Sequence, residues 1–205
     1  MTETPEASAL VDLVELMARL RAECGWKAAQ THRSLSRHLL EETYETLEAI
    51  ETLDEGGTDA DLCEELGDLL LQVYFHAAIA AETGRFDIED VATGLREKLL
   101  RRNPHVFGEV IATDPAEINE HWEAVKATEK QRTGLFEGIP LELPALARAA
   151  KVLDRLERAG RPVTAPAHGD LGERLLALVA EARDQGLDPE QELRDVLRRM
   201  THPDG

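Results

Sequence analysis

Two close-set groups of carboxylates interrupt two apolar, helix-periodic segments of this chain, and they restrict its fold more than any other feature. The first group is Glu41-Glu42-Thr43-Tyr44-Glu45 and the second is Glu64-Glu65-Leu66-Gly67-Asp68. On a helix, residues three and four apart share a face, so each group presents paired carboxylates on one side. Burying unpaired charges beside leucines is unfavourable. We therefore expect a positive charge to lie between these two helices.

The spacing of the two groups predicts that they face one another. Gly56-Gly57 separates the two helical segments, and Glu45 and Asp68 each lie about eleven residues from these glycines. In an antiparallel hairpin, residues at equal distances from the turn fall at the same height, and Glu42 and Glu65 lie within a turn of them. Four carboxylates can therefore converge at the edge of the bundle core. Like charges in such a place raise one another's pKa unless a cation neutralises them.

The ligand chemistry of this group favours a hard divalent cation. Carboxylate oxygens, with no Cys and no His at matching spacing, select Mg²⁺ or Mn²⁺ over zinc. A di-iron site in a helical bundle needs a Glu-x-x-His motif on each of two helices, and no His in this chain stands three residues after a Glu. We therefore expect a Mg²⁺ site, with Mn²⁺ as an alternative. The expected ligands are Glu42, Glu45, Glu65 and Asp68.

Apolar residues recur at intervals of three and four through most of the chain, which predicts an all-α fold. No strand-like alternation of useful length is present. The expected helices run from about 10 to 20, 36 to 53, 59 to 84, 87 to 102, 115 to 126, 144 to 158, 170 to 185 and 189 to 200, with 26–33 as a connector. His76, among apolar residues of the third expected helix, is interpreted as structural.

The composition changes beyond residue 130, which divides the chain into two predicted domains. Residues 1–130 form the expected catalytic domain, and residues 131–205 hold a linker helix and two further helices. Asp170-Leu171-Gly172-Glu173 resembles Glu65-Leu66-Gly67-Asp68, and a Gly and an acidic stretch follow each motif. The second domain is therefore interpreted as a shortened, degenerate second repeat. It lacks a counterpart of the first carboxylate group, so activity is assigned to the first domain.

The charge of the chain restricts its partners. With 41 acidic and 23 basic residues the formal net charge is −18, which argues against a nucleic-acid polymer or an anionic membrane surface as the main partner. Two cysteines, no apolar run long enough for a membrane span and no basic or apolar leader predict a reduced, cytoplasmic protein. A small anionic substrate fits this charge only where a cation or a basic cluster receives it.

A basic cluster near the middle of the chain can receive such a substrate. Lys98 and Arg102 share one helix face, and Trp122 and Lys126 repeat the four-residue spacing in the next expected helix. Considered alone, the basic residues could simply interact favourably with the dipole at a helix C-terminus, and Trp122 could be a core residue. Beside a metal site, a flat ring and a cationic group suit a nucleobase and its phosphates. These four residues are the expected substrate-binding set.

Taken in order, these motifs resemble those of the MazG family of nucleoside triphosphate pyrophosphohydrolases. The resemblance covers roughly residues 10 to 158. It is carried by Glu41-Glu42-Thr43-Tyr44-Glu45, Glu65-Leu66-Gly67-Asp68, Gly84-Arg85-Phe86-Asp87, Lys98-Leu99-Leu100-Arg101-Arg102-Asn103-Pro104-His105-Val106-Phe107-Gly108 and Trp122-x-x-x-Lys126. It implies a helical bundle whose antiparallel helices carry E-E-x-x-E and E-x-x-D, assembled as a homodimer or a higher homo-oligomer.

The resemblance also implies an activity, namely Mg²⁺-dependent hydrolysis of an NTP or dNTP at the α-phosphorus to the monophosphate and pyrophosphate. Such a reaction would clear unwanted nucleotides from the pool. The metal ligands implied are Glu42, Glu45, Glu65 and Asp68, and the phosphate-binding residues are Lys98, Arg102 and Lys126, with Trp122 beside them. Glu41 is our hypothesis for the residue that orients or deprotonates the attacking water.

Two other interpretations stay open at this point. The chain could be a catalytically silent helical module that binds nucleotide or regulates another protein. Alternatively, it could be a narrower enzyme that acts on dUTP alone or on a phosphoribosyl nucleotide.

Overall fold

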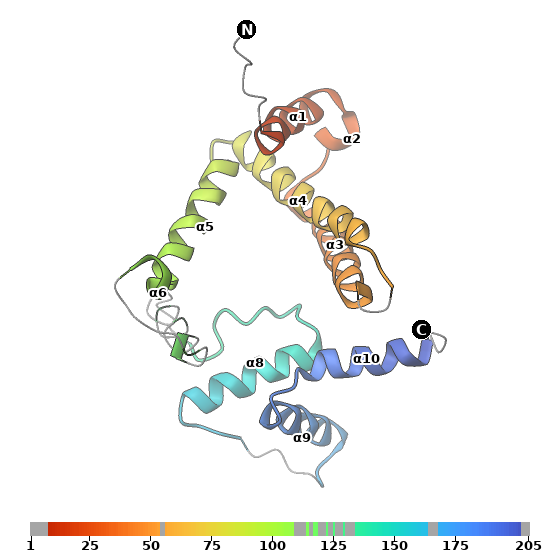
Figure 1. Ribbon diagram of the computed structural model, residues 1–205, viewed down its shortest axis with the longest axis vertical. Coiled ribbons are helices and arrows are strands. Elements are labelled where there is room, and N and C mark those ends of the chain that lie inside the picture. Colours follow the sequence, from red (N-terminus) through yellow and green to blue (C-terminus); the bar gives the residue numbers. More distant parts are fainter. Residues whose placement is uncertain are drawn as a thin grey trace. The chain divides into compact units, whose positions relative to one another are not determined.

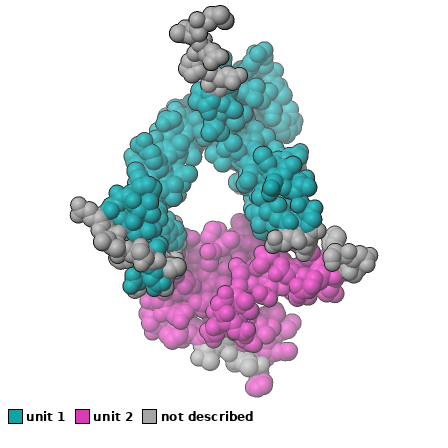
Figure 2. All heavy atoms as spheres, in the orientation of Figure 1, with its two compact units in different colours: residues 1–125 teal, residues 126–205 magenta. Residues whose placement is uncertain are grey.

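The structure of the 205-residue chain is a computed structural model. It describes residues 8–53, 56–108, 114, 117–118, 122, 125, 129, 134–163 and 168–201. Every regular element within these residues is a helix, which confirms the predicted all-α class. The chain consists of two compact units, Met1–Val125 and Lys126–Gly205 (Figures 1 and 2). None of the described helices is both long and apolar enough to span a membrane.

An antiparallel helix hairpin is central to the first unit. The helices of this unit are α1 (Ala9–Glu23), α2 (Gly25–Ala28), α3 (His32–Thr52), α4 (Asp59–Ala81), α5 (Ile88–Arg102) and α6 (Pro104–Phe107). α3 and α4 lie side by side along their length, and α1 packs against α4 (Figure 1). α5 contacts α4 and then leads away from the hairpin (Figure 1). The predicted antiparallel pairing of the two carboxylate-bearing helices is therefore confirmed.

The turn between α3 and α4 depends on two glycines and a capping box. Gly56 has a φ of 106°, a conformation that glycine adopts without a steric penalty. Gly57 lies so close to Thr52 that a Cβ at Gly57 would collide with it. Thr58 and Asp61 then begin α4, because the side chain of each accepts a hydrogen bond from the backbone N–H of the other. These contacts reverse the chain within a short turn.

The start of α3 differs from the sequence prediction. Residues 26–33 are not a plain connector, because they contain most of α2 and the first residues of α3, which begins at His32 rather than near Ser36. The Thr31 hydroxyl accepts from the Ser34 N–H, and the Ser34 hydroxyl accepts from the Thr31 N–H. The usual capping box has Glu or Gln where this one has Ser, so its signal in the sequence is weak. The additional turn brings His32 onto α3.

The core of the first unit joins α1, α3 and α4. Its buried residues are Met17, Leu35, Tyr74, Phe75 and Ile79. Leu35 is only 1% exposed, and the Tyr74 hydroxyl donates a 2.7 Å hydrogen bond to the Leu10 carbonyl oxygen. Apolar packing and one long-range hydrogen bond therefore attach α1 to the hairpin.

Arg21 ties α1 to the end of α4 and to α2. Its guanidinium forms two 2.6 Å contacts with the Glu82 carboxylate and donates to the carbonyl oxygens of Lys27, Ala28 and Gln30. The hydrogen bond from Arg21 lowers the pKa of Glu82. Because the Arg21 side chain is only 8% exposed, we interpret it as a structural cation.

The helix expected from about 115 to 126 falls mostly outside the residues that the structure describes. Those that it does describe, Glu117, Ile118, Trp122 and Val125, are helical.

The second unit packs three helices around Leu153 and Val179. These helices are α8 (Ala145–Arg158), α9 (Leu171–Asp184) and α10 (Pro189–Thr201). Asp170 and Glu173 begin α9, since the carboxylate of each accepts from the backbone N–H of the other. The predicted boundary after residue 130 and the interpretation of this unit as a degenerate repeat stay predictions.

Leu35→Ala is expected to lower the free energy of unfolding by about 2–5 kcal/mol, because it leaves a cavity in the core. Leu40→Ala, on the same helix but at a side chain that is 56% exposed, is expected to change it by about 0.5 kcal/mol or less. Urea unfolding followed by circular dichroism measures both. Equal effects of the two substitutions would contradict the location of the core.

Candidate functional site

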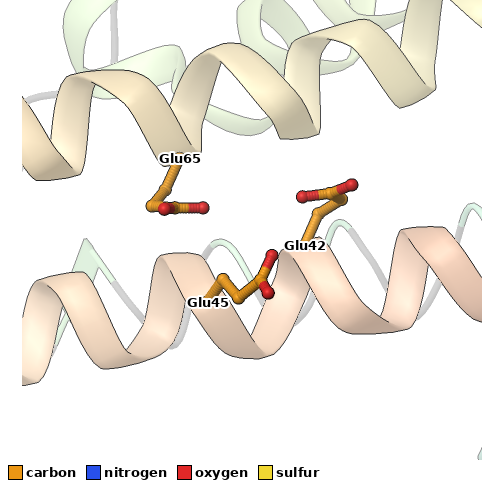
Figure 3. A group of neighbouring side chains, drawn as sticks. All are labelled: Glu42, Glu45 and Glu65. Atoms are coloured by element: carbon orange, nitrogen blue, oxygen red, sulfur yellow. The ribbon is translucent and has the colours of Figure 1, made fainter.

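Carboxylates from α3 and α4 gather between the two helices. Glu42 and Glu45, one turn apart on α3, extend toward the side of α4 that carries Glu65 (Figure 3). One carboxylate oxygen of each residue lies within 4.8 Å of those of the other two. Glu42 and Glu65 are half-buried, whereas Glu45 is exposed. Three of the four expected metal ligands are therefore brought together.

Thr46 fixes the register of the helices at this point. It is 4% exposed, and its hydroxyl lies 2.8 Å from the Glu42 carbonyl oxygen and 3.3 Å from that of Glu65. The first contact stays within α3, but the second crosses to α4. A buried hydroxyl with partners on both helices stabilises one alignment of their turns. That alignment places Glu65 opposite the Glu42 and Glu45 pair.

Asp68 and Glu41 lie outside this close group of oxygens. Asp68 is half-buried, and its charge acts on Glu42, so it borders the group. Glu41 is exposed, and its carboxylate lies 3.0 Å from Nδ1 of His38, whose ring packs edge-on against Trp26 with 6.3 Å between centroids. The His38–Glu41 contact was not among the sequence predictions, although a three-residue spacing on a helix is a usable signal.

Comparisons with known proteins identify the family. The sequence model described as the MazG nucleotide pyrophosphohydrolase domain matches residues 30–107. The nucleoside triphosphate pyrophosphohydrolase/pyrophosphatase MazG of Thermotoga maritima is 38% identical over 216 residues, which cover 92% of this chain and 81% of that protein. The chain belongs to the MazG family.

Two further relatives of this MazG-family chain differ in length. An uncharacterized 26.1 kDa protein in the blaB 3' region of Streptomyces cacaoi is 47% identical over 189 residues, covering 90% of this chain and 76% of the relative. The nucleoside triphosphate pyrophosphohydrolase of Mycobacterium tuberculosis is 47% identical over 156 residues, covering 75% of this chain but only 46% of that protein. The chain therefore spans less than half the length of the mycobacterial relative.

Burial and like charge raise the pKa of two carboxyl groups in this MazG-family site. For Glu42, burial is the largest cause of the raised pKa, followed by the negative charge of Asp68 and a hydrogen bond with Glu45. For Glu65, burial is again the largest cause of the raised pKa, followed by the charges of Glu45 and Asp68. A cation between the helices would reverse this effect, because it favours the ionised carboxylates.

The donor set suits a hard divalent cation. Glu65 Oε2 is buried and has no hydrogen-bond partner among the described residues. The close group consists of carboxylates alone, without His or Cys, among the residues that the structure describes. Mg²⁺ and Mn²⁺ prefer such oxygen ligands. An unpartnered carboxylate oxygen next to two further carboxylates is therefore a suitable set of ligands for Mg²⁺ or Mn²⁺.

The expected substrate-binding residues lie on α5 and beyond it. Arg102, in the last turn of α5, holds its guanidinium carbon 5.3 Å from the ring centroid of Trp122, so these two residues do come together. Lys98 lies one turn earlier on α5, which leads away from the α3–α4 hairpin (Figure 1). Lys126 lies outside the described residues. The carboxylates and the Arg102–Trp122 pair thus form separate groups.

Glu65→Gln is expected to raise the urea midpoint of the metal-free protein at pH 7.5, because it removes one of three crowded negative charges. The gain should shrink toward pH 5, where the raised pKa leaves the wild-type carboxyl increasingly protonated and the repulsion weaker. Glu48→Gln removes the same charge from an exposed position on α3 and should have little effect. A loss of stability in Glu65→Gln would contradict the crowding of these charges.

Proposed function

We propose that this MazG-family chain hydrolyses nucleoside triphosphates, NTPs or dNTPs, at the α-phosphorus, and releases the monophosphate and pyrophosphate. The observation that carries this proposal is the gathering of carboxylate oxygens from Glu42, Glu45 and Glu65 between α3 and α4. The Thermotoga and mycobacterial relatives, named as nucleoside triphosphate pyrophosphohydrolases, support the substrate class. We further propose that the reaction takes place in the cytoplasm and clears unwanted nucleotides from the pool.

The metal in this proposal is Mg²⁺, with Mn²⁺ as an alternative. When bound, it would polarise phosphoryl oxygens and offset the negative charge of the triphosphate. The proposed ligands are Glu42, Glu45, Glu65 and Asp68. Because these ligands come from two helices, a bound metal would also fix the distance between α3 and α4 where the substrate binds.

The remaining residues act on the water and on the phosphates. A water oxygen attacks the α-phosphorus, the bond from this phosphorus to the bridging oxygen of the β-phosphate breaks, and pyrophosphate leaves. Glu41 is the proposed residue that orients this water or accepts its proton. Lys98, Arg102 and Lys126 are proposed to take up charge on the leaving group, with Trp122 bracing the arginine.

A homodimer or a higher homo-oligomer would complete this site. Large apolar side chains are exposed on the hairpin and on α5, namely Leu66, Val73, Val91, Leu95, Leu99 and Leu100. Exposed apolar residues in such number favour an association surface. Since α5 leads away from the hairpin of its own chain (Figure 1), we propose that Lys98 and Arg102 act on the carboxylates of a second copy.

Glu42→Ala and Asp68→Ala are each expected to reduce pyrophosphate release at least about 100-fold, because the metal loses a ligand. Glu48→Ala, an exposed position on the same helix as Glu42, should keep wild-type turnover. A panel of NTPs and dNTPs with Mg²⁺, Mn²⁺ or EDTA measures the activity, and it also detects an enzyme restricted to dUTP. Unimpaired turnover in either site variant would refute the site. Nucleotide binding by the wild type without turnover would favour the silent module.

Mixing two inactive variants tests whether the site is shared between copies. Glu42→Ala and Arg102→Ala chains, refolded together in equal amounts, should regain about one quarter of wild-type activity. About half of the dimers are then mixed, and each mixed dimer holds one intact composite site. Pyrophosphate release measures the gain, and each variant refolded alone is the control. No recovery in verified mixed dimers would mean that both groups act within one chain.

A further inference from the structure

A pair of histidines joins α3 to α4 outside the carboxylate site. Nδ1 of His32 and Nδ1 of His76 lie 2.7 Å apart, and the two rings are nearly parallel with 5.1 Å between centroids. Arg85, which follows α4, places Nη2 2.8 Å from Nε2 of His32. These contacts connect the first turn of α3, the second half of α4 and the turn that precedes α5.

The arginine fixes the protonation of both rings. A guanidinium has only donors, so Nε2 of His32 must accept and carries no proton. The proton of a neutral His32 therefore lies on Nδ1, and it is donated to Nδ1 of His76. The proton of His76 then lies on Nε2. This arrangement of hydrogen bonds requires both rings to be neutral.

Two buried polar atoms lie one turn apart on the same face of α4. Nε2 of His76 is buried without a hydrogen-bond partner among the described residues, and so is Oε1 of Gln72, one turn earlier. Gln72 is 4% exposed. With its proton on Nε2, His76 presents a buried donor and Gln72 Oε1 is a buried acceptor, but the two atoms are not hydrogen-bonded to each other. Asp68 lies one further turn along this face, so the histidine pair and the carboxylate site share one side of α4.

Charged groups on the surrounding elements are engaged elsewhere. From α1, Arg21 binds Glu82, and from α2 the Lys27 ammonium lies 5.3 Å from the ring centroid of Phe75. At the start of α5, Asp87 accepts from a backbone N–H of the first turn. Within the described part of the chain, no carboxylate forms an ion pair with either histidine ring. A charged ring at this position would thus have no anionic partner.

We propose that His32 and His76 are positioning residues that hold α3 against α4 only while both rings are neutral, so that acidification loosens this end of the helix pair. A proton added to His32 would direct an N–H at Arg85. A proton added to His76 would set two Nδ1–H groups against each other. Burial also lowers the pKa of His76.

The consequence for the carboxylate site follows from the length of α3. Glu42 lies ten residues beyond His32, about 15 Å along the helix. Because the helix is continuous between the two residues, a displacement of the first turns of α3 also changes the position of Glu42. This part of the proposal depends on the proposed hydrolytic function, whereas the effect on stability and the ring protonation do not.

Unfolding by urea between pH 8 and pH 5 tests the stability. The unfolded His76 has a pKa of about 6.5, and the native pKa is lower. The contribution of His76 to stability is therefore fully present above about pH 6.5. As the pH falls from there to the native pKa, one histidine raises the equilibrium constant for unfolding by up to about tenfold per pH unit. Both tryptophans belong to the first unit, so their fluorescence reports this transition.

His76→Gln is the decisive variant for this measurement. Glutamine keeps a donor and an acceptor but does not titrate. The number of protons taken up on unfolding in this pH range should therefore fall by about one. His168→Gln, at an exposed histidine of the second unit, should keep the wild-type dependence. An unchanged dependence in His76→Gln would overturn the proposal.

Nitrogen-15 spectra of the histidine rings test the tautomers directly. At pH 7.5 we expect His32 to be protonated on Nδ1 alone and His76 on Nε2 alone, with His32→Asn and His76→Gln identifying the signals. Arg85→Ala removes the donor that fixes the pair, so the Nε2-protonated form of His32 should become populated. Two charged rings at pH 7.5, or an unchanged tautomer of His32 in Arg85→Ala, would overturn the proposal.

Pyrophosphate release at pH 6 relative to pH 8 tests the link to the site. His76→Gln should keep a larger fraction of its activity at pH 6 than the wild type does, while His168→Gln should match the wild type. An equal loss in His76→Gln and the wild type would remove the positioning role. If the wild type releases no pyrophosphate under any condition, the hydrolytic proposal fails, and the unfolding and ring spectra still decide the histidine proposal.

Discussion

Crowded negative charge between α3 and α4 is the constraint on which the rest of the first unit depends. Three carboxylate oxygens come within 4.8 Å of one another, and burial raises the pKa of Glu42 and Glu65. Such a group drives the two helices apart unless other contacts hold them together. Thr46 supplies one such contact beside the group, and Leu35 supplies another in the core. A divalent cation would convert the same carboxylates from a repulsive group into a further contact between the helices.

Two basic side chains next to the helix hairpin are engaged in structural contacts. Arg21 is committed to Glu82 and to carbonyl oxygens near α2, and Arg85 is bonded to His32. Both support the helix hairpin rather than its carboxylate site. Arg102 stacks on Trp122 at the far end of α5. A triphosphate that approaches the carboxylates meets further negative charge there, which a bound metal and cations from α5 of a second copy would offset. The distribution of charge thus favours both parts of the proposed assembly.

The fold and the carboxylates were predictable because their signals are local and periodic. Helical spacing and the two glycines of the turn placed Glu45 level with Asp68 and put Glu42 and Glu65 within a turn of them, whereas the close group in the structure is Glu42, Glu45 and Glu65. The early start of α3 was missed because Ser34 replaces the usual acidic or amide residue of a capping box. The contact of His32 with His76 spans 44 positions, and nothing in either local sequence indicates it. Whether α5 meets the carboxylates was beyond prediction for a similar reason, since it depends on the packing of whole helices.

The two acidic motifs of this chain show how position within a helix decides the chemistry of a carboxylate. Asp170 and Glu173 lie at the N-terminus of α9, where their carboxylate oxygens accept hydrogen bonds from backbone N–H groups that have no partner within the helix. Glu65 and Asp68 have the same spacing inside α4, where the backbone N–H groups are already bonded within the helix. Their oxygens must therefore find partners elsewhere, and Glu65 Oε2 has none within the described residues. A similar motif thus completes a helix in one unit and leaves acceptors available to a cation in the other.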